Sequence, residues 1–475
     1  MSENPEADIS IAIHNAEKVY DDAVPPEFSD VALALRLVKQ HGHKLRHVAA
    51  WGKWLIWNDK YWRRDSTLEV FDLARGICRI AAAECNEPHT AKRIASAQTI
   101  AAVEKIAKAD RSVAATIDQW DADPWLLNTP GGVVDLRTGI VRQHNTHDYM
   151  TKITSIAPDG ECPTWVEFLN KVTGGNNDLI EYLRRKAGYC LTGSVKEQDL
   201  DFFYGTGGNG KGLFLNTITG IMNSYAAVAN MDTFVASQNE KHPTDLAMLH
   251  GARLVTAQET ESGQRWAESK IKMMTGGDLI TARFMRQDFF TFMPQFKLII
   301  AGNHKPGLRN VDAAIRRRFH LVPFTVTISE NEKDRNLPEK LKAEWPGILK
   351  WAIAGAKEWH ESGLNPPTIV REATDEYFSA EDTLELWIAE GCVLTKNSRA
   401  TMTDLFNEWT KWCDARGEYN GSMKKFSQNL RAKHPELKEW QCPITRRLGL
   451  EGIQAIKPML NNETNDPFET IESFT

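Results

Sequence analysis

A glycine-rich loop that ends in a lysine constrains this 475-residue chain more than any other feature of its sequence. Residues 200–204 form a short apolar run, residues 205–212 read GTGGNGKG, and residues 213–221 have helical spacing. Glycines let backbone N–H groups converge on phosphate oxygens, the helix N-terminus adds partial positive charge, and Lys211 supplies a full charge. Strand, loop and helix in this order predict a nucleotide-phosphate site. Its predicted contacts are Gly205, Thr206, Gly207, Gly208, Asn209, Gly210, Lys211 and Gly212.

One position of the loop departs from the usual pattern. Gly212 stands where a Ser or Thr normally places its hydroxyl on Mg²⁺. Three interpretations fit this departure. Waters and downstream acids hold the metal, or a hydroxyl such as that of Thr206 or Thr217 replaces the missing one. In the third, hydrolysis is impaired, and the protein binds nucleotide without acting as a motor.

Two further apolar runs, residues 253–257 and 296–301, are predicted to be strands that end in polar residues. An acid at the end of a strand beside a phosphate loop is where Mg²⁺ and the attacking water are held. We assign Glu259 to this catalytic and metal-binding role, with Glu261 as the second choice. Asn303 follows the other strand, and its neutral amide can orient the attacking water, so we predict that it is the sensor.

Three consecutive arginines precede the predicted strand at residues 320–324. Such a run is often a solvated face. A guanidinium that reaches the γ-phosphate is, however, what an arginine finger requires. We predict that Arg317 or Arg318 is this finger and acts on a neighbouring subunit. The prediction implies an oligomer.

Strands that alternate with helical segments between residues 200 and 324 predict a parallel sheet with helices on both faces. Upstream, residues 51–62 read as a β-hairpin, and residues 67–118 have helical spacing with a break near Pro88. The predicted fold class is α/β, with a P-loop NTPase core between two smaller domains. The predicted divisions are a flexible arm (1–30), an α+β domain (31–160), the core with its flanking helices (161–365), a winged-helix-like domain (380–456) and an acidic tail (457–475).

The charge of the chain does not by itself suggest a nucleic-acid partner, because 57 Lys and Arg against 63 Asp and Glu give −6. Positive charge is nevertheless concentrated at residues 421–450, where a winged helix-turn-helix is predicted to bind DNA; binding to a protein, or a solvated face, fits as well. A predicted hairpin at residues 279–294 carries arginines among aromatic residues, so it either packs or contacts a single strand. The predicted DNA contacts in these two segments are Arg283, Arg286, Lys424, Lys425, Arg446 and Arg447.

The seven cysteines are scattered, without Cys-x-x-Cys pairs, so neither a disulfide framework nor a zinc site is expected. The N-terminus is polar and acidic, and no run of about 18 apolar residues occurs. We therefore expect a cytoplasmic protein that is neither exported nor inserted in a membrane.

Taken together, these motifs resemble those of superfamily III helicases, and more narrowly the helicase part of phage and plasmid primase-helicases. The motifs GTGGNGKG, RLVTAQETESG, KMMTGGD, AGNHKP and AIRRRF follow the family's order. The segments DPWLLN and GVVDLRTG resemble the region that precedes the helicase core in that family, so the resemblance covers residues 35 to 330 approximately.

The resemblance implies an AAA+ core that forms a ring, usually a hexamer, and uses ATP and Mg²⁺ to move 3′ to 5′ along single-stranded or forked DNA. It further implies a phage or mobile element replicating in a bacterial host cytoplasm, with a separate primase or polymerase as partner. The residues carried over are Lys211, Glu259, Asn303, Arg317 or Arg318, and the two basic residues of the hairpin segment that are predicted to contact DNA, Lys272 and Arg283.

The leading hypothesis is thus an ATP-dependent replicative DNA helicase. The alternative is a nucleotide-gated DNA-binding or loading ATPase that does not unwind DNA, which Gly212 motivates. A free-standing primase is a third hypothesis. Asp121 and Asp123 have the spacing of a two-metal carboxylate pair, but fewer than about 35 residues precede the matched region, which is too few for a polymerising domain.

Overall fold

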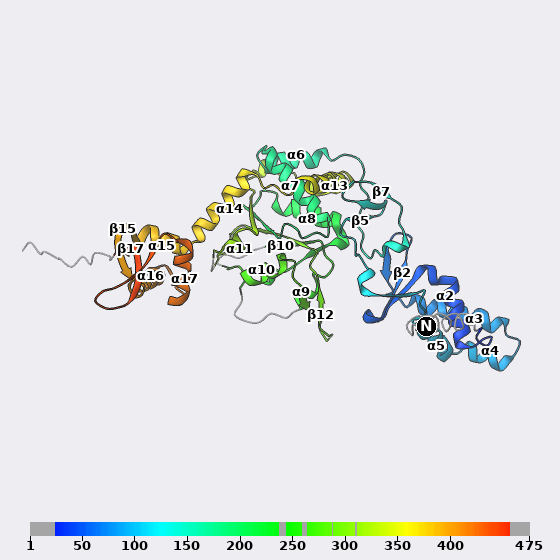
Figure 1. Ribbon diagram of the computed structural model, residues 1–475. Helices are drawn as coiled ribbons and strands as arrows, with labels where there is room; N and C mark the ends of the chain where they lie inside the picture. Colours follow the sequence, from blue (N-terminus) through cyan, green and yellow to red (C-terminus); the bar gives the residue numbers. More distant parts are fainter. Residues whose placement is uncertain (1–23, 237–243, 259–263, 287, 309–310, 457–475) are drawn as a thin grey trace, which may run out of the picture.

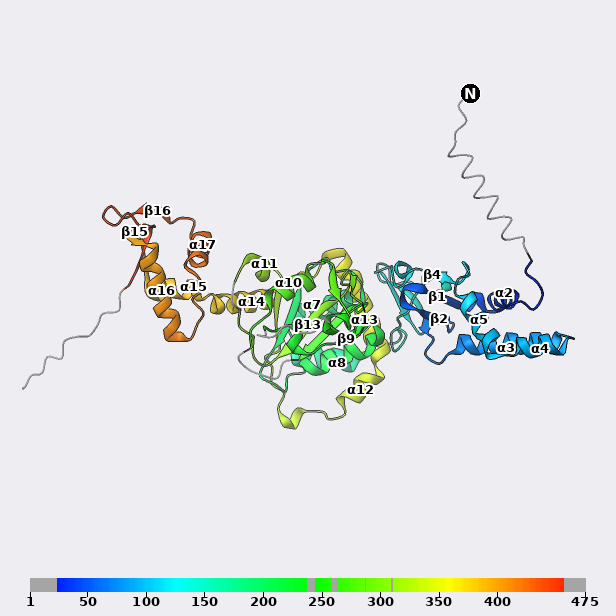
Figure 2. The same ribbon diagram turned by 90° about the horizontal axis from the view of Figure 1, so that it is seen from below.

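The computed structural model describes residues 24–236, 244–258, 264–286, 288–308 and 311–456. Three folded parts follow one another along the chain, and the views in Figures 1 and 2 both show the central part between the other two. All seven cysteines lie in these residues and are free, as the sequence predicts. None of the helices in the described ranges combines the length and the apolar character that crossing a bilayer requires.

The N-terminal part is a four-stranded sheet packed against helices. The sheet has the order β3-β2-β1-β4, in which β1 pairs antiparallel with β2 and parallel with β4. The strands are β1 (Leu45–Val48), β2 (Lys53–Trp57), β3 (Trp62–Arg64) and β4 (Ala114–Ala115), and the helices are α2 (Asp30–His41), α3 (Glu69–Glu84), α4 (Pro88–Ile94) and α5 (Ala97–Ala107).

The prediction that helical structure extends to about residue 118 is wrong. The last helix ends at Ala107, and a turn follows in which Asp110 accepts hydrogen bonds from the backbone N–H and the hydroxyl of Ser112. This local competition by a short acidic side chain stops the helix and redirects the chain into β4.

A small antiparallel sheet and two helices connect this part to the centre. The strands are β5 (Leu126–Thr129), β6 (Gly132–Asp135) and β7 (Val141–Arg142), and the helices are α6 (Pro163–Val172) and α7 (Asn177–Leu191). The side chain of Asn176 caps α7 by accepting a hydrogen bond from the backbone N–H of Leu179.

The centre is a five-stranded sheet in the order β14-β8-β13-β10-β9, and every neighbouring pair is parallel. This confirms the predicted parallel sheet. The short edge strand β9 escaped prediction, because two alanines and a valine carry little strand signal. The strands are β8 (Leu200–Tyr204), β9 (Ala226–Val228), β10 (Leu254–Gln258), β13 (Lys297–Gly302) and β14 (Phe319–Pro323).

Alternate residues along the strands enter two separate cores. Phe203 and Ile299 pack on one side of the sheet with α6, α7, α8 (Lys211–Met222) and α13 (Trp345–Ser362). Phe202 and Leu298 pack on the other side with α10 (Glu268–Thr275) and α14 (Thr368–Glu381). Burial on both faces explains why these strands read as nearly continuous apolar runs.

The C-terminal part follows α14 and has its own core around Trp387, Trp409 and Phe426. Its sheet is antiparallel, in the order β15-β17-β16. The elements are α15 (Thr383–Gly391), β15 (Cys392–Thr401), α16 (Met402–Arg416), α17 (Met423–Lys433), β16 (Lys438–Gln441) and β17 (Leu448–Ala455).

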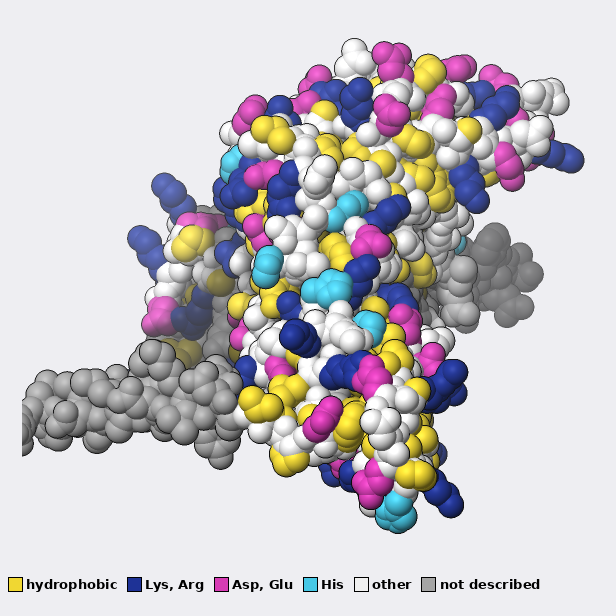
Figure 3. Space-filling view, turned by 90° about the vertical axis from the view of Figure 1, so that its right-hand side faces the viewer, with side chains coloured by type: hydrophobic (Ala, Val, Ile, Leu, Met, Phe, Trp, Pro, Cys, Tyr) yellow, Lys and Arg dark blue, Asp and Glu magenta, His cyan; other side chains and the backbone are white. Residues whose placement is uncertain are grey.

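Charge is mixed on the surface that Figure 3 shows. Lys and Arg side chains alternate there with Asp and Glu over most of the face.

Candidate functional site

The predicted phosphate loop joins β8 to α8 at the carboxyl edge of the central sheet. Gly207, Gly208 and Gly210 have φ angles of 98°, 64° and 84°, in the left-handed region that glycine adopts at low cost. A Cβ on Gly210 would lie 2.6 Å from Cγ1 of Val172 and 2.9 Å from Cε2 of Phe168. The loop conformation therefore requires these glycines and leaves a backbone-lined cradle suited to phosphate oxygens.

The ammonium of Lys211 lies under this loop. Its Nζ donates to Gly205 O at 2.7 Å, to Asn209 Oδ1 at 3.0 Å and to Asn303 Oδ1 at 3.3 Å. The residue is only 6% exposed, and burial lowers the pKa of its ammonium. Lys211 forms no ion pair with a carboxylate of the described residues, so its charge is solvated by neutral oxygens and remains available to an anion.

Asn303 meets Lys211 although 91 residues separate them in the sequence. The contact arises because β13 and β8 are parallel neighbours that pair Gly302 with Tyr204, so both chains leave the sheet at the same edge. The neighbouring strand β10 ends at Gln258. The structure thus brings together two of the predicted catalytic residues.

The predicted acids Glu259 and Glu261 lie outside the described residues. Their assignment, and with it the protein ligand of Mg²⁺, stays a prediction. The hydroxyl alternatives differ in position. Thr206 is exposed on the loop itself, whereas Thr217 is buried six residues into α8 from Lys211, about 9 Å along the helix axis. Thr206 is therefore the better placed of the two.

Two lysines that the sequence analysis did not single out lie near the loop. Lys305 Nζ lies 4.2 Å from the ring centroid of Tyr204, the last residue of β8. Lys333 Nζ lies 3.6 Å from where a Cβ of Gly208 would be, and Ile328 N donates to the carbonyl of Gly208 at 3.2 Å. Lys305 could have been predicted from the sequence, because it follows Asn303 by two residues. No local sequence pattern indicates that Lys333 lies near the loop.

The three arginines lie at the opposite edge of the sheet. Arg316 ends α11 (Ala313–Arg316), and Arg317 and Arg318 lie between this helix and β14. β14 is parallel to β8 and is about 16 Å long, so the length of the strand separates the arginines from the loop at the carboxyl edge. Arg317 is exposed and has no ion-pair partner among the described residues. Arg318 is only 7% exposed, and its Nη1 donates to Ala314 O at 2.6 Å. Of the two candidates, Arg317 is the one free to contact another molecule.

The predicted hairpin is formed by β11 (Ile280–Ala282) and β12 (Phe290–Phe292), which pair antiparallel. It lies at the lower end of the central part in Figure 1. Arg283 Cζ lies 4.7 Å from the ring centroid of Phe289, which is 60% exposed, and Arg286 is exposed. Cations beside exposed aromatic rings are what contact with a single strand requires.

The remaining predicted DNA contacts occupy three other places. Lys272 is on α10, outside the hairpin, where its Nζ pairs with Asp312 at 2.6 Å. The four predicted contacts in the C-terminal part are exposed and lie in two segments, the first turn of α17 and the turn between β16 and β17. They are Lys424 and Lys425 in the helix, and Arg446 and Arg447 in the turn.

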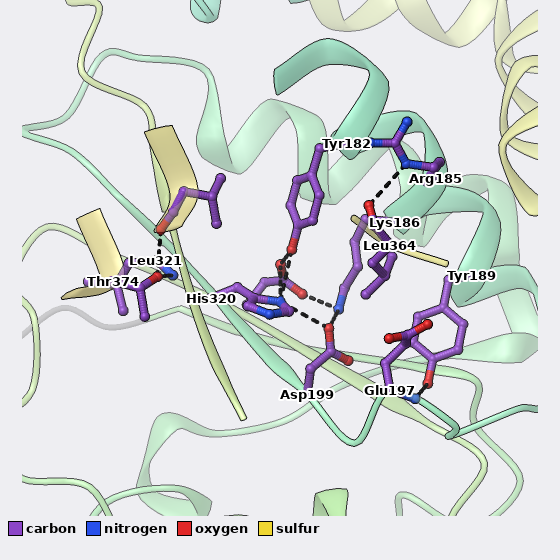
Figure 4. Close-up of polar contacts among 12 residues, drawn as sticks. Tyr182, Arg185, Lys186, Tyr189, Glu197, Asp199, His320, Leu321, Leu364 and Thr374 are labelled. Carbon is purple, nitrogen blue, oxygen red and sulfur yellow. Dashed lines mark hydrogen bonds and ion pairs between the residues drawn. The ribbon is translucent and has the colours of Figure 1, made fainter. Parts of the chain in front are cut away.

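A buried charge network that the sequence analysis missed lies at the amino edge of the sheet (Figure 4). The Nζ of Lys186, on α7, is 2.6 Å from Asp199 Oδ2 and also pairs with Asp201. His320 Nδ1 lies 3.3 Å from Asp199 Oδ2 and 3.1 Å from the hydroxyl of Tyr182. The ligand atoms of the two aspartates and the histidine lie within 4.8 Å of one another, a spacing that a metal ion could use. The ammonium of Lys186 already pairs with both carboxylates, so we assign the network a structural role.

Protonation in this network follows its charges. Burial disfavours the charged form of Lys186, but Asp199 and Asp201 outweigh burial and raise its pKa. Burial likewise opposes ionisation of Asp199, yet Lys186 and His320 hold the pKa of that carboxyl below its usual range. For His320, the carboxylates overcome burial and raise the pKa of the imidazole. The readable signal was the pair Asp199 and Asp201, two acids around one leucine at the start of a strand that is otherwise apolar.

Family comparisons match two regions of the chain. Residues 34–174 match the family described as D5 N terminal like, and residues 203–318 match a family of unknown function, DUF5906. The second region begins in β8 and ends at Arg318, so it includes the predicted phosphate loop, Asn303 and the three arginines. Two curated viral proteins named as helicases also match. The chain is thus similar to phage and viral primase-helicases. This confirms the resemblance drawn from the motifs.

The first curated relative is "Putative helicase L207/L206" of Acanthamoeba polyphaga mimivirus, which is 25% identical over 355 residues, 69% of this chain and 36% of that protein. The second is "Putative helicase 022R" of Frog virus 3 (isolate Goorha), 23% identical over 266 residues, 51% of this chain and 27% of that protein. The chain thus matches about a third of the length of these relatives. An apo structure of the NrS-1 C-terminal region matches with a TM-score of 0.47 and 10% identity, covering 91% of this chain and 100% of that chain.

Proposed function

We propose that this primase-helicase-like chain is an ATP-dependent DNA helicase that moves along single-stranded DNA during phage or mobile-element replication. The observation that carries the proposal is the contact between Lys211 and Asn303 at the glycine loop, with Arg317 exposed at the other edge of the same sheet. This arrangement supports hydrolysis between two copies of the chain, because β14 separates Arg317 from its own loop by about 16 Å.

In the proposed reaction ATP is the substrate, and the glycine cradle binds its phosphates. Lys211 neutralises phosphate charge, Asn303 orients the attacking water, and Arg317 of a neighbouring copy stabilises the charge that develops on the γ-phosphate. Mg²⁺, when bound, would neutralise the charge on the β- and γ-phosphates, and we propose Glu259 as its protein ligand, with Glu261 as the second choice. Repeated around a ring, this interface is that of an AAA+ motor, and we propose a hexamer.

The proposed DNA path starts at the hairpin. Arg283 and Arg286, beside exposed aromatic rings, would hold the phosphates and stack the bases of a single strand. The C-terminal part has the element order helix, strand, two helices and hairpin, which favours a winged helix-turn-helix. We propose that its exposed basic residues contact duplex or forked DNA. A separate primase or polymerase in the host cytoplasm would complete the replication machinery.

The alternative proposal is a nucleotide-gated DNA-binding or loading ATPase without unwinding activity. The observation that favours it is Gly212, which leaves the loop without the usual metal-binding hydroxyl. This alternative predicts ATP binding with negligible turnover. DNA-stimulated hydrolysis together with strand separation would exclude it.

The test compares ATP hydrolysis and forked-duplex unwinding by the wild type, Lys211→Ala and Arg317→Ala. Each variant should lose both activities, by about 10³-fold for Arg317→Ala if the arginine acts as a finger. Lys39→Ala, at an exposed position of α2, is the matched control and should keep wild-type rates. If Lys211→Ala still unwinds the forked duplex, the hypothesis that ATP hydrolysis at this loop drives strand separation is wrong.

Mixing the two inactive variants tests the trans arrangement. An interface that joins the intact loop of an Arg317→Ala subunit to the intact Arg317 of a Lys211→Ala subunit has every proposed catalytic residue. Hydrolysis should therefore return on mixing, to a fraction of the wild-type rate. If no activity returns from subunits that still assemble together, Arg317 does not act in trans.

A further inference from the structure

We infer that Tyr377 and Glu381, on helix α14, are positioning residues that hold the loop carrying Asn303 in place beside the phosphate loop. We call residues 303–308 the Asn303 loop. The inference deepens the proposed function and rests on it for the reaction that Asn303 serves. Both residues lie in α14, outside the phosphate loop and the arginine run, so they act through Asn303 rather than on the nucleotide.

The Asn303 loop leaves the sheet directly after β13 and has to be held by other elements. At its near end Asn303 is exposed, and its amide oxygen accepts a 3.3 Å hydrogen bond from Lys211 Nζ. At its far end Gly307 N donates to Gln264 O at 2.9 Å, and Trp266 N donates to Gly307 O at 3.0 Å. The position of Asn303 therefore depends on the contacts that fix the middle and the end of this loop.

The hydroxyl of Tyr377 fixes the middle of the loop. It donates to Pro306 O and accepts a 3.1 Å hydrogen bond from the indole Nε1 of Trp266. Both aromatic side chains are buried. One hydroxyl therefore satisfies two polar groups, one on the Asn303 loop and one on the segment that pairs with it. Phenylalanine at this position would keep the ring and remove only these two hydrogen bonds.

The carboxyl group of Glu381 holds the end of the loop. Its Oε2 accepts a 2.7 Å hydrogen bond from Leu308 N and lies 3.4 Å from where a Cβ of Gly307 would be. Burial raises the pKa of this carboxyl, whereas the hydrogen bond from Leu308 lowers it. A carboxylate and a neutral carboxyl both have an oxygen that can accept this bond, so the contact needs an acceptor rather than a charge. Glutamine can therefore replace Glu381 in this contact, and alanine cannot.

Helix geometry points both residues the same way. Thr374, Tyr377 and Glu381 follow one another at spacings of three and four residues, which places them on one face of α14. The hydroxyl of Thr374 accepts a 2.9 Å hydrogen bond from Leu321 N on β14, so this face is attached to the central sheet as well. One face of α14 thus joins the sheet to the Asn303 loop.

A lysine of the loop contacts two aromatic rings. Lys305 Nζ lies 4.2 Å from the ring centroid of Tyr204 and 6.0 Å from that of Tyr377. Tyr204 ends β8, directly before the phosphate loop. The cation therefore links the Asn303 loop both to α14 and to the strand that carries the phosphate loop.

The anchoring matters for catalysis because an amide that orients water works only over a narrow range of positions. A displacement of about 1 Å can lower a rate by about 100-fold. Phosphate binding depends on the glycine cradle and on Lys211, whose hydrogen bonds to Gly205 and Asn209 do not involve the Asn303 loop. Loss of an anchor should therefore lower kcat and leave the KM for ATP nearly unchanged.

The experiment measures steady-state ATP hydrolysis by Tyr377→Phe and Glu381→Ala, with the stoichiometry of ATP binding as the check on folding. Each variant should lower kcat by about tenfold, with a KM for ATP within about twofold of the wild-type value. Glu381→Gln keeps an acceptor and should restore most of kcat. Glu372→Gln, at an exposed position of the same helix, is the matched control and should keep the wild-type rate. Unchanged kcat in both test variants would overturn the inference. Glu381 is only half-buried, so its variants give the answer even where Tyr377→Phe folds poorly.

A double-mutant comparison tests whether the anchors act through Asn303. Glu381→Ala added to Asn303→Ala should lower kcat by less than about twofold further, because the position of the loop no longer matters once the amide is absent. A further loss of about tenfold on top of that from Asn303→Ala would show an effect independent of the amide, and the inference would be wrong.

The proposed function is judged separately. A wild-type protein that hydrolyses ATP without unwinding a fork defeats the helicase proposal, while the kinetic comparison still decides the inference. If the wild type does not hydrolyse ATP at all, amide hydrogen exchange of residues 303–308 decides it. Exchange there should be faster in Glu381→Ala than in the wild type and in Glu381→Gln, because the N–H of Leu308 loses its acceptor. Equal exchange in the three proteins would contradict the inference.

Discussion

Two buried lysines at opposite edges of one sheet differ in how their charge is balanced. Lys211, at the carboxyl edge, is held by a carbonyl and two side-chain amide oxygens, and burial lowers the pKa of its ammonium. Lys186, at the amino edge, pairs with two carboxylates that raise its pKa. The first charge is left for a ligand, whereas the second is used in holding α7 to the sheet.

The largest effect that sharpens this comparison is expected for Lys186→Met. Removing the ammonium leaves Asp199 and Asp201 buried side by side with only the imidazole of His320 to balance them, which should lower the free energy of unfolding by about 3–5 kcal/mol. Chemical denaturation of the purified protein measures this. Loss of the cation should also allow an aspartate to take up a proton near neutral pH.

Lys211→Met is the matched control, because it makes the same substitution at the other edge. No described carboxylate is orphaned there, and the oxygens of Gly205 and Asn209 can accept other hydrogen bonds, so stability should change by about 1 kcal/mol or less. Equal destabilisation by the two substitutions would contradict the distinction between a ligand-binding and a structural lysine.

A smaller, pH-dependent effect is expected at His320. The carboxylate of Asp199 raises the pKa of this imidazole above its value in the unfolded chain. The stability that His320 contributes is therefore fully present below the unfolded pKa, and it is lost as pH rises through the folded pKa. The difference in unfolding free energy between the wild type and His320→Gln should shrink as pH is raised from about 6 upward. A difference that stays constant or grows over this range would show that the imidazole is not held protonated.

The carboxyl edge could be predicted from sequence because its signals are local. A glycine-rich loop after a buried strand specifies the position of Lys211, and the rule that parallel strands end at one edge places Asn303 beside it. The run of arginines was visible too. Choosing between Arg317 and Arg318 required knowing which side chain turns inward, and the short helix α11 determines that.

The charge network at the amino edge could not be predicted because its partners are far apart in sequence. The sequence around Asp199 and Asp201 indicates a buried pair of acids, but no neighbouring residue in the sequence indicates that Lys186 and His320 neutralise this pair. Long-range packing of α7 and β14 makes that choice.

The smallest expected effect concerns Gly212, where the loop departs from its usual pattern. A Cβ added there meets no atom within 4 Å, so Gly212→Ser and Gly212→Ala should both fold, with about 1 kcal/mol of added stability from better helix propensity. If waters and downstream acids hold the metal, the serine should change the rate of ATP hydrolysis only a few-fold relative to alanine. Because alanine fills the same space without a hydroxyl, a much faster serine variant would identify the missing metal ligand as the limit on the natural loop. Titrating Mg²⁺ in both variants would then show whether the gain arises from tighter metal binding.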